Sequence, residues 1–346
     1  MTRSRWRTTG FWIFTVACAI GVIGYIRWRV TDVAPIAVAQ LLDPSDSQAA
    51  STIDALRSRP HLIFLSSRVD APGQMAMTSL ESLDPPILLA GPQCERGYAG
   101  KTFTLCLTLN QESMQPRGFA LILDRRFQTV AKLPLAGLPI RARVSPDQRY
   151  AVATVFVTGE SYGGDFTTRT TLIDLASKRA IADLEQFAVE RDGKPFKAVD
   201  FNFWGVTFFQ DGNQFFATLG TGGQRLLVKG DIAQRKLRVV TGDVECPSLS
   251  PDERHIVFKR QRKGKAGWQL WALELSTMKE WPITDDGQDI DDQVEWLDEG
   301  HVVYGLLYGS GAPDTTLSLW TSAIAPDSDR QPRLFMRSGW SPSVLH

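Results

Sequence analysis

The sequence predicts an all-β fold, a six-bladed β-propeller closed by its C-terminal strand and preceded by an N-terminal membrane-anchoring helix. Three observations lead to this prediction: a turn motif that recurs about every 45 residues, four strand-like segments in each repeat, and a basic stretch followed by an apolar run at the N-terminus. We expect a basic cytoplasmic segment at residues 1–9, a signal anchor at 10–29, a linker at 30–59 and the propeller at 60–346.

The N-terminal segment determines the expected location of the protein. Arg3, Arg5 and Arg7 precede an uncharged run of about 17 residues, at positions 10–26, which is the pattern of an export signal and just reaches membrane-spanning length. Arg-Trp-Arg at 27–29 follows this run, where a cleaved signal would have small residues. We therefore expect a single-pass anchor in the cell membrane with the propeller outside the cytoplasm, or a secreted protein if the signal is cleaved.

The repeat is marked by a turn aspartate. Asp147 and Asp252 stand in Ser-Pro-Asp strings, and Asp211 and Asp298 occupy the corresponding turns of two further units. The spacings are 64, 41 and 46 residues, the first lengthened by an insertion around residues 187–199. One strand-like segment precedes each aspartate and three follow it, rich in β-branched and aromatic residues and separated by Gly, Asp and Lys. Four strands at this period indicate propeller blades rather than helical repeats.

Two weaker units, at residues 61–91 and 92–137, bring the number of blades to six. The first unit has only three strands of its own, and a strand-like string at 340–345 follows the last unit. An open ring would leave two unpaired strand edges. We therefore expect residues 340–345 to provide the innermost strand of blade one and to close the ring.

Two of the four cysteines are placed for a disulfide. Cys94 and Cys106 lie on neighbouring predicted strands of blade two, and an exported protein would experience an oxidising environment. We expect them to be bonded; two buried thiols are the alternative. The role of Cys246 is open. The four histidines are scattered and no C-x-x-C pair occurs, so we expect no metal site and no cofactor.

The blades resemble those of TolB-like (WD40-like) propellers. The resemblance is carried by Ser-Pro-Asp at 145–147 and 250–252, each followed by an apolar strand, and by Leu270-Trp271 in a later strand. More narrowly, NFWGVTF, ECPSLSPD and DDQVEWLD, which begin at positions 202, 245 and 291, resemble actinobacterial TolB-like translocation proteins with a signal peptide. The resemblance covers about residues 60–346. It implies a six-bladed propeller outside the cytoplasm and no particular activity.

Two classes of function are disfavoured. A serine hydrolase would need a strained nucleophile turn that leads from a strand into a helix, with a His and an acid beside it. The only G-x-S-x-G string, at 159–163, falls instead in a polar loop between two predicted strands of one blade, so we expect no enzyme. Lys plus Arg equals Asp plus Glu, 38 against 38, whereas a nucleic-acid partner would require a basic surface.

Polar residues that precede the innermost strands of several blades form the candidate binding site. We expect them to make a polar ring at one mouth of the central channel and to bind a ligand, a cation or a basic peptide; they are Asp200, Asn202, Glu245, Asp291 and Asp292. The acidic run at 285–292 does not have the EF-hand spacing, and a solvated loop is the other interpretation. The basic stretch at 259–265 is expected to be a solvated hairpin.

These features favour a non-enzymatic, monomeric binding or scaffold module that recognises an envelope protein or peptide. The alternative is a sensor that binds a small molecule, glycan or metal in the central channel. The sequence names neither partner nor ligand.

Overall fold

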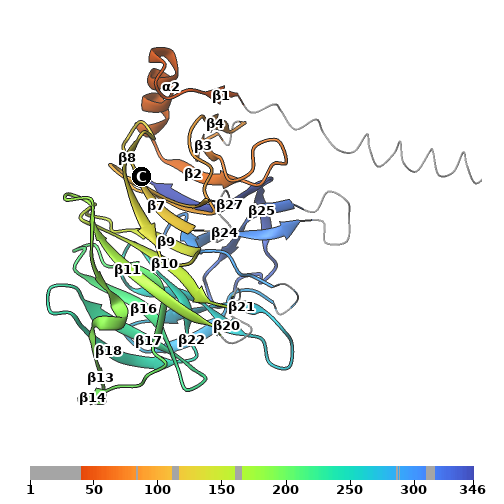
Figure 1. The fold of residues 1–346 in the computed structure, drawn as a ribbon. Helices are drawn as coiled ribbons and strands as arrows, with labels where there is room; N and C mark the ends of the chain where they lie inside the picture. Colours follow the sequence, from red (N-terminus) through yellow and green to blue (C-terminus); the bar gives the residue numbers. More distant parts are fainter. Residues whose placement is uncertain are drawn as a thin grey trace, which may run out of the picture. The chain divides into compact units, whose positions relative to one another are not determined.

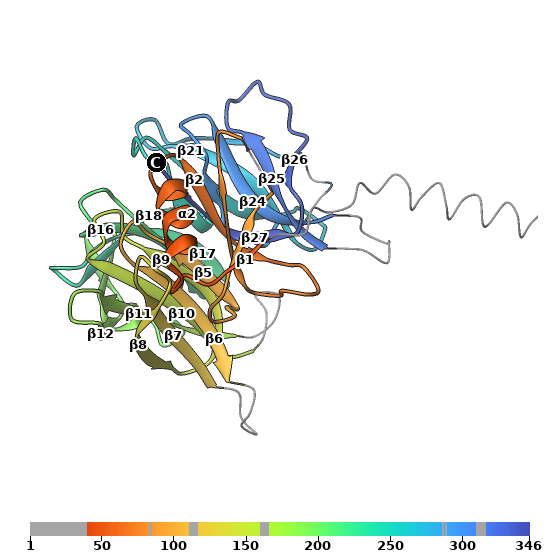
Figure 2. The same cartoon turned by 90° about the horizontal axis from the view of Figure 1, so that it is seen from above.

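Six sheets arranged in sequence order around a central axis make up the protein (Figures 1 and 2). The computed structural model describes residues 40–346 except 83–84, 111–116, 160–165, 286, 288 and 309–315. The predicted cytoplasmic segment and signal anchor lie outside the described residues. None of the helices that are described has the length and apolar character needed to cross a membrane.

The four main strands of each blade are antiparallel, and the first of them is nearest the axis. Blade one contains β27 (Gly339–Leu345), β2 (His61–Ser66), β3 (Met75–Ser79) and β4 (Ile87–Leu89). Blade two contains β5 (Arg96–Ala99), β6 (Thr104–Asn110), β7 (Arg117–Leu123) and β8 (Thr129–Leu135). Blade three contains β9 (Leu138–Val144), β10 (Tyr150–Thr158), β11 (Thr167–Asp174) and β12 (Arg179–Asp183).

The second half of the ring has the same plan. Blade four contains β15 (Asn202–Phe208), β16 (Gln214–Thr221), β17 (Gln224–Asp231) and β18 (Lys236–Gly242). Blade five contains β19 (Glu245–Leu249), β20 (His255–Gln261), β21 (Trp268–Glu274) and β22 (Lys279–Pro282). Blade six contains β23 (Glu295–Trp296), β24 (His301–Tyr308), β25 (Thr316–Ala323) and β26 (Arg333–Met336). The predicted six blades are confirmed.

The C-terminal strand closes the ring as predicted. β27 pairs antiparallel with β2, from His61 opposite Leu345 to Ser66 opposite Gly339. It also bonds to the next blade, since the Ser343 hydroxyl accepts from the Ala99 amide at 2.9 Å. The first and last parts of the propeller are thereby held in one sheet.

The recurring turns are built by side chains that bond their own backbone. In the first Ser-Pro-Asp turn, the Ser145 hydroxyl accepts from the Tyr150 amide at 2.9 Å and donates to Asp147 at 2.6 Å. Ser250 and Asp252 repeat this arrangement in blade five. The residue after the aspartate has a positive φ in each case, 61° at Gln148 and 59° at Glu253; in blade four this position is Gly212, with φ 66°. The sequence repeat therefore reflects one turn geometry.

The propeller unit begins at Gln40 and not at residue 60. β1 (Leu41–Leu42) pairs parallel with β4 and so extends blade one at its outer edge. The helix α2 (Ser47–Arg57) starts after Asp46, whose carboxylate accepts from the Gln48 amide at 2.7 Å. Residues 40–59, expected to be part of a linker, are thus packed against the propeller, because α2 buries Ile53 in its core.

The predicted insertion between blades three and four also joins a sheet. The short 3₁₀ helix η1 (Leu184–Gln186) leads into the hairpin of β13 (Ala188–Arg191) and β14 (Lys194–Phe196). β13 pairs parallel with β18, so blade four has six strands. Apolar side chains fill the space between neighbouring blades, as where Val152 and Leu172 of blade three meet Phe203 of blade four.

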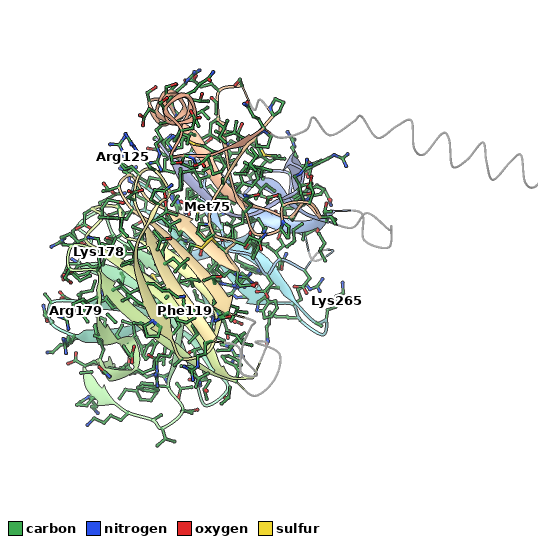
Figure 3. The ribbon with its side chains drawn as sticks, turned by 45° about the horizontal axis from the view of Figure 1, so that its top comes forward. Met75, Phe119, Arg125, Lys178, Arg179 and Lys265 are labelled. Atoms are coloured by element: carbon green, nitrogen blue, oxygen red, sulfur yellow. A yellow bond between two sulfur atoms is a disulfide. The ribbon has the colours of Figure 1, made fainter. Side chains whose placement is uncertain are left out.

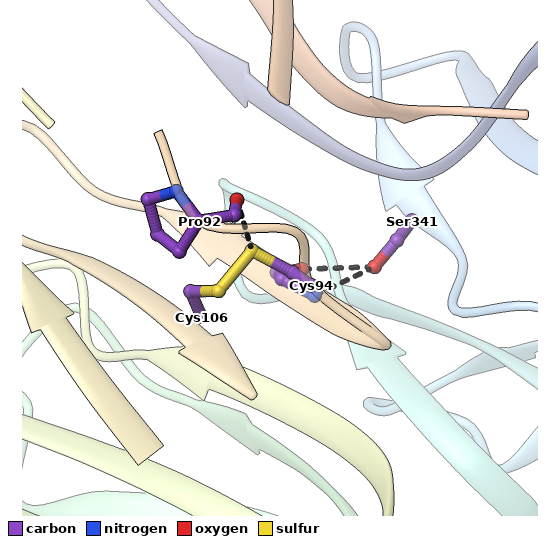
Figure 4. The surroundings of a disulfide bond; sticks show 5 residues. Pro92, Cys94, Cys106 and Ser341 are labelled. Atoms are coloured by element: carbon purple, nitrogen blue, oxygen red, sulfur yellow. Dashed lines mark hydrogen bonds between the residues drawn. A yellow bond between two sulfur atoms is a disulfide. The ribbon is translucent and has the colours of Figure 1, made fainter. Parts of the chain in front are cut away.

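The predicted disulfide is present. Cys94, just before β5, is bonded to Cys106 in β6 (Figure 4). Ser341 of β27 lies beside it (Figure 4). The Ser341 hydroxyl donates to the Gly97 carbonyl at 2.8 Å and accepts from the Gly97 amide at 3.3 Å. The covalent bond therefore stands next to the point where the closing strand meets blade two.

Replacing both cysteines, Cys94→Ser with Cys106→Ser, is expected to destabilise the protein by about 3 kcal/mol, because the bond closes a loop of 12 residues in the unfolded chain. Thermal unfolding with and without a reducing agent measures this. Cys246→Ser serves as the control and should keep its sensitivity to the reducing agent. Wild-type unfolding that is unchanged by reduction would contradict the stabilising role.

The buried carboxyl of Glu185 should make stability depend on pH. Burial raises its pKa from 4.5 to about 7, although it accepts a hydrogen bond from the Thr170 amide at 3.1 Å. A raised carboxyl pKa favours folding while the group is protonated, so this contribution is lost as pH rises from about 4.5 to 7. Glu185→Gln stays neutral at every pH. At pH 8 its free energy of unfolding is expected to exceed that of the wild type by about 2 kcal/mol after allowance for solvent screening, and at pH 4.5 the two values should be equal. Denaturant titrations at the two pH values measure the difference; an equal difference at both would exclude Glu185 as its source.

Candidate functional site

The central axis is crossed by side chains from opposite blades. Arg143 on β9 of blade three forms a buried ion pair with Glu295 on β23 of blade six. Tyr98 on β5 donates to Glu295 at 3.3 Å, and the Arg143 guanidinium lies 4.7 Å from the centre of the Tyr98 ring. Arg143 also donates to the Ser248 hydroxyl of blade five at 3.4 Å. Four blades thus contribute to one polar cluster in the middle of the ring.

The electrostatics of this cluster keep it paired. Burial raises the pKa of the Glu295 carboxyl against the attraction of Arg143. Burial also opposes the charge on Arg143, but the Glu295 carboxylate raises the pKa of the guanidinium, which keeps its proton. Removing either partner would leave the other one buried without compensation.

A second group of charges lies towards the end where the innermost strands begin. Arg141 of β9 donates to the Asp291 carboxylate at 2.9 Å and to the Asp291 carbonyl at 3.0 Å. The ammonium of Lys259 on β20 is bonded to the same carboxylate oxygen. Arg96 of β5 donates to the Ile140 carbonyl at 2.9 Å and also attracts Asp291. We call this end, with Arg96, Arg141, Lys259 and Asp291, the basic mouth.

Two tryptophans flank the basic mouth. The Lys259 ammonium lies 5.0 Å from the centre of the Trp268 ring, and the Arg96 guanidinium lies 4.5 Å from that of Trp340. Attraction between a cation and an aromatic face fixes both positive groups. The mouth therefore combines positive charge with aromatic side chains.

The structure places the five residues of the predicted polar ring in different surroundings. Asp292 is buried and accepts from the amides of Gly305 and Ser341, each at 2.8 Å, which joins blade six to the closing strand. Glu245 is buried as well, where it accepts from Trp268 Nε1 at 3.2 Å. Only Asp291 of the three lies with its side chain half exposed in the basic mouth.

The other two residues hold blade four. Asp200 accepts from the Thr221 hydroxyl and the Gly222 amide, both at 2.6 Å, and so fixes the β16–β17 hairpin. Asn202 accepts from the Thr168 amide of blade three at 2.7 Å. These contacts tie neighbouring elements together rather than turning the side chains towards Asp291.

Sequence reasoning missed the cations of the axis. Lys259 was expected in a solvated hairpin, but it lies in β20 with its side chain 1% exposed. Arg141 and Arg143 were not singled out at all. Their spacing of two within a buried strand places both on one face of the sheet, and this was the available signal.

The opposite end of the channel holds a cavity of about 240 Å³. Tyr98, Arg143 and Glu295 line it, as do Lys101, Ser145 and Glu253. We call this end the opposite mouth. In the part of the chain that the structure describes, no cluster of three or more His, Cys, Asp or Glu side chains could hold a metal ion.

The central ion pair should be energetically coupled. Arg143→Met or Glu295→Gln alone is expected to cost about 3–5 kcal/mol, since each leaves a buried charged or polar group unpaired. The double variant should cost less than the sum of the two. Urea unfolding of the four proteins in a double-mutant cycle measures the coupling. Strictly additive effects would show that the two side chains do not stabilise each other.

Comparisons with known proteins agree with the fold. No protein-family model matches the sequence, and no curated protein does. Among solved structures, TolB from Acinetobacter baumannii matches with a TM-score of 0.54 and 15% identity, over 86% of this chain and 69% of that one. A putative TolB from Agrobacterium tumefaciens matches with a TM-score of 0.48 and 14% identity, over 82% of this chain and 90% of that one.

An enzyme is also among the similar structures. Oligogalacturonate lyase in complex with manganese matches with a TM-score of 0.48 and 10% identity, over 79% of this chain and 88% of that one. At these identities a likeness reports the fold and not the activity. The described residues between 40 and 346 therefore form a six-bladed β-propeller whose fold is similar to that of TolB.

Proposed function

We propose that the protein is a non-enzymatic binding module that recognises a protein or peptide partner at the basic mouth. The observation that carries this proposal is the convergence of Arg141 from blade three and Lys259 from blade five on the half-exposed Asp291, beside Trp268 and Trp340. Arginine and tryptophan are the residue types that most often dominate binding energy in protein interfaces.

The closed axis supports binding at a mouth. The pair Arg143–Glu295 crosses the ring behind Asp291, so a partner at the basic mouth would engage side chains at the end of the channel. A protruding segment of a folded partner, or a peptide, suits such a surface better than a chain threaded through the ring.

A location outside the cytoplasm is part of this proposal. The basic stretch and apolar run at residues 1–29 have the pattern of a signal anchor. The Cys94–Cys106 disulfide is independent support, because such bonds persist mainly in oxidising compartments. We propose a membrane-tethered propeller whose partner is an envelope protein, in line with the resemblance to actinobacterial TolB-like translocation proteins.

A small-molecule sensor is the second candidate, and the opposite mouth favours it. Its cavity of about 240 Å³ contains the polar groups of Tyr98, Arg143 and Glu295, which could orient a polar ligand. This volume is below the roughly 300–1,000 Å³ of usual ligand pockets, so the ligand would be small.

Site-specific photo-crosslinking in native membranes tests the main proposal. A benzophenone side chain replaces Lys265, in the hairpin between β20 and β21 on the side of the basic mouth; the control position is Arg125, which lies on the other side of the molecule (Figure 3). Position 265 is expected to give one discrete adduct with an envelope protein and position 125 none.

Arg141→Gln should weaken that adduct about tenfold, as expected for a residue central to an interface, and Lys101→Gln at the opposite mouth should leave it unchanged. Equal adducts at both positions, or an adduct insensitive to Arg141, would rule out recognition at the basic mouth.

A further inference from the structure

In the basic mouth, two of the cations are buried, whereas the anion that pairs with them is half exposed to solvent. The side chains of Arg141 and Lys259 are 6% and 1% exposed, whereas the Asp291 side chain that pairs with both is 49% exposed. Burying cations is costly unless an anion stabilises them. Here the stabilising anion is the group that solvent reaches.

The surroundings of Asp291 favour negative charge strongly. Burial by itself would raise the pKa of Asp291, but Lys259 and Arg141, with a further contribution from Arg96, lower it far below its usual range. The cations belong to blades two, three and five, so the ring holds them in place whatever occupies the mouth. A position that stabilises one carboxylate in this way also suits a second one brought by a ligand.

We propose that the basic mouth is an anion-binding site for a carboxylate-bearing ligand, and that Asp291 is a built-in counter-ion which competes with the ligand for Arg141 and Lys259. The inference rests on the proposed function and specifies the chemistry of the partner: an acidic side chain or a terminal carboxylate of a peptide. The ligand charge is opposite to the one expected from the sequence, because the acids of the mouth would attract a cation or a basic peptide.

If Asp291 competes with the ligand, removing its charge should strengthen ligand binding. Asp291→Asn removes the competing charge and nearly keeps the shape, so carboxylate binding should become about tenfold tighter, because the two cations no longer share a full negative charge. Arg141→Gln and Lys259→Met should each abolish detectable binding. Lys101→Gln, which removes a positive charge at the opposite mouth, should bind as the wild type does.

Isothermal titration calorimetry on the purified full chain, at constant ionic strength, measures these affinities. The probes are succinate, inorganic phosphate and the tripeptide Gly-Gly-Glu in its acid and amide forms. Binding of succinate and the acid tripeptide, but not of the amide, is the expected result. Preference for phosphate over both carboxylates would replace the carboxylate assignment with a phosphate one.

Two outcomes overturn the proposal: weaker anion binding in Asp291→Asn than in the wild type, or no heat of binding with any probe in either protein. Circular dichroism shows whether the Arg141 and Lys259 variants are folded. If they are not, the comparison of Asp291→Asn with the wild type still decides the proposal. The two proposals fail separately. If anions bind but no partner is crosslinked, the proposed protein partner is rejected and the anion site is kept. If a partner is crosslinked but no anion binds, the anion site is rejected and the protein partner is kept.

Discussion

The pairing of β27 with β2 is the constraint on which the rest of the structure depends. A propeller blade packs only against its two neighbours, so an unclosed ring would expose two sheet edges and two apolar faces. The pairing from His61–Leu345 to Ser66–Gly339 removes both. The bonds from Ser341 and Ser343 to β5, beside the disulfide, connect this closure to blade two.

Closure also fixes the distances across the axis. Arg143 can meet Glu295, and Arg141 can meet Asp291, only when blade three and the beginning of blade six face each other across a complete ring. The paired residues are 152 and 150 positions apart in the sequence but lie within hydrogen-bonding distance in the structure. They divide the channel into two mouths of different character: one with cations, a half-exposed carboxylate and tryptophans, the other with a small cavity.

The function that we propose follows from this division. Charged groups that bridge the axis turn the channel ends into separate surfaces, and the rigid ring holds the cations of the basic mouth at fixed separations. A preorganised set of positive groups loses little entropy when an anion arrives, which favours recognition by the propeller without a conformational change. The acids of the mouth act mainly on the protein's own cations and backbone amides, as Asp291 and Asp292 illustrate.

The sequence by itself determined the number of blades, the position of the closing strand and the disulfide. These features depend on local chemistry that repeats along the chain: the hydroxyl of Ser145 or Ser250 bonding its own turn, the alternation of strand residues, and two cysteines in neighbouring strands. The sequence also indicated Asp291 as a residue of the mouth, because its place before an innermost strand is a matter of blade register.

Only the tertiary structure decided what Asp291 faces. Its partners Arg141 and Lys259 come from blades three and five, and no local pattern states which residues of different blades meet at the axis. The same is true of β1 and α2, whose segment is polar enough to resemble a linker but packs through Ile53. Local turns and strands are encoded by short-range spacing, whereas the charge that a mouth presents is the sum of side chains brought together by ring closure.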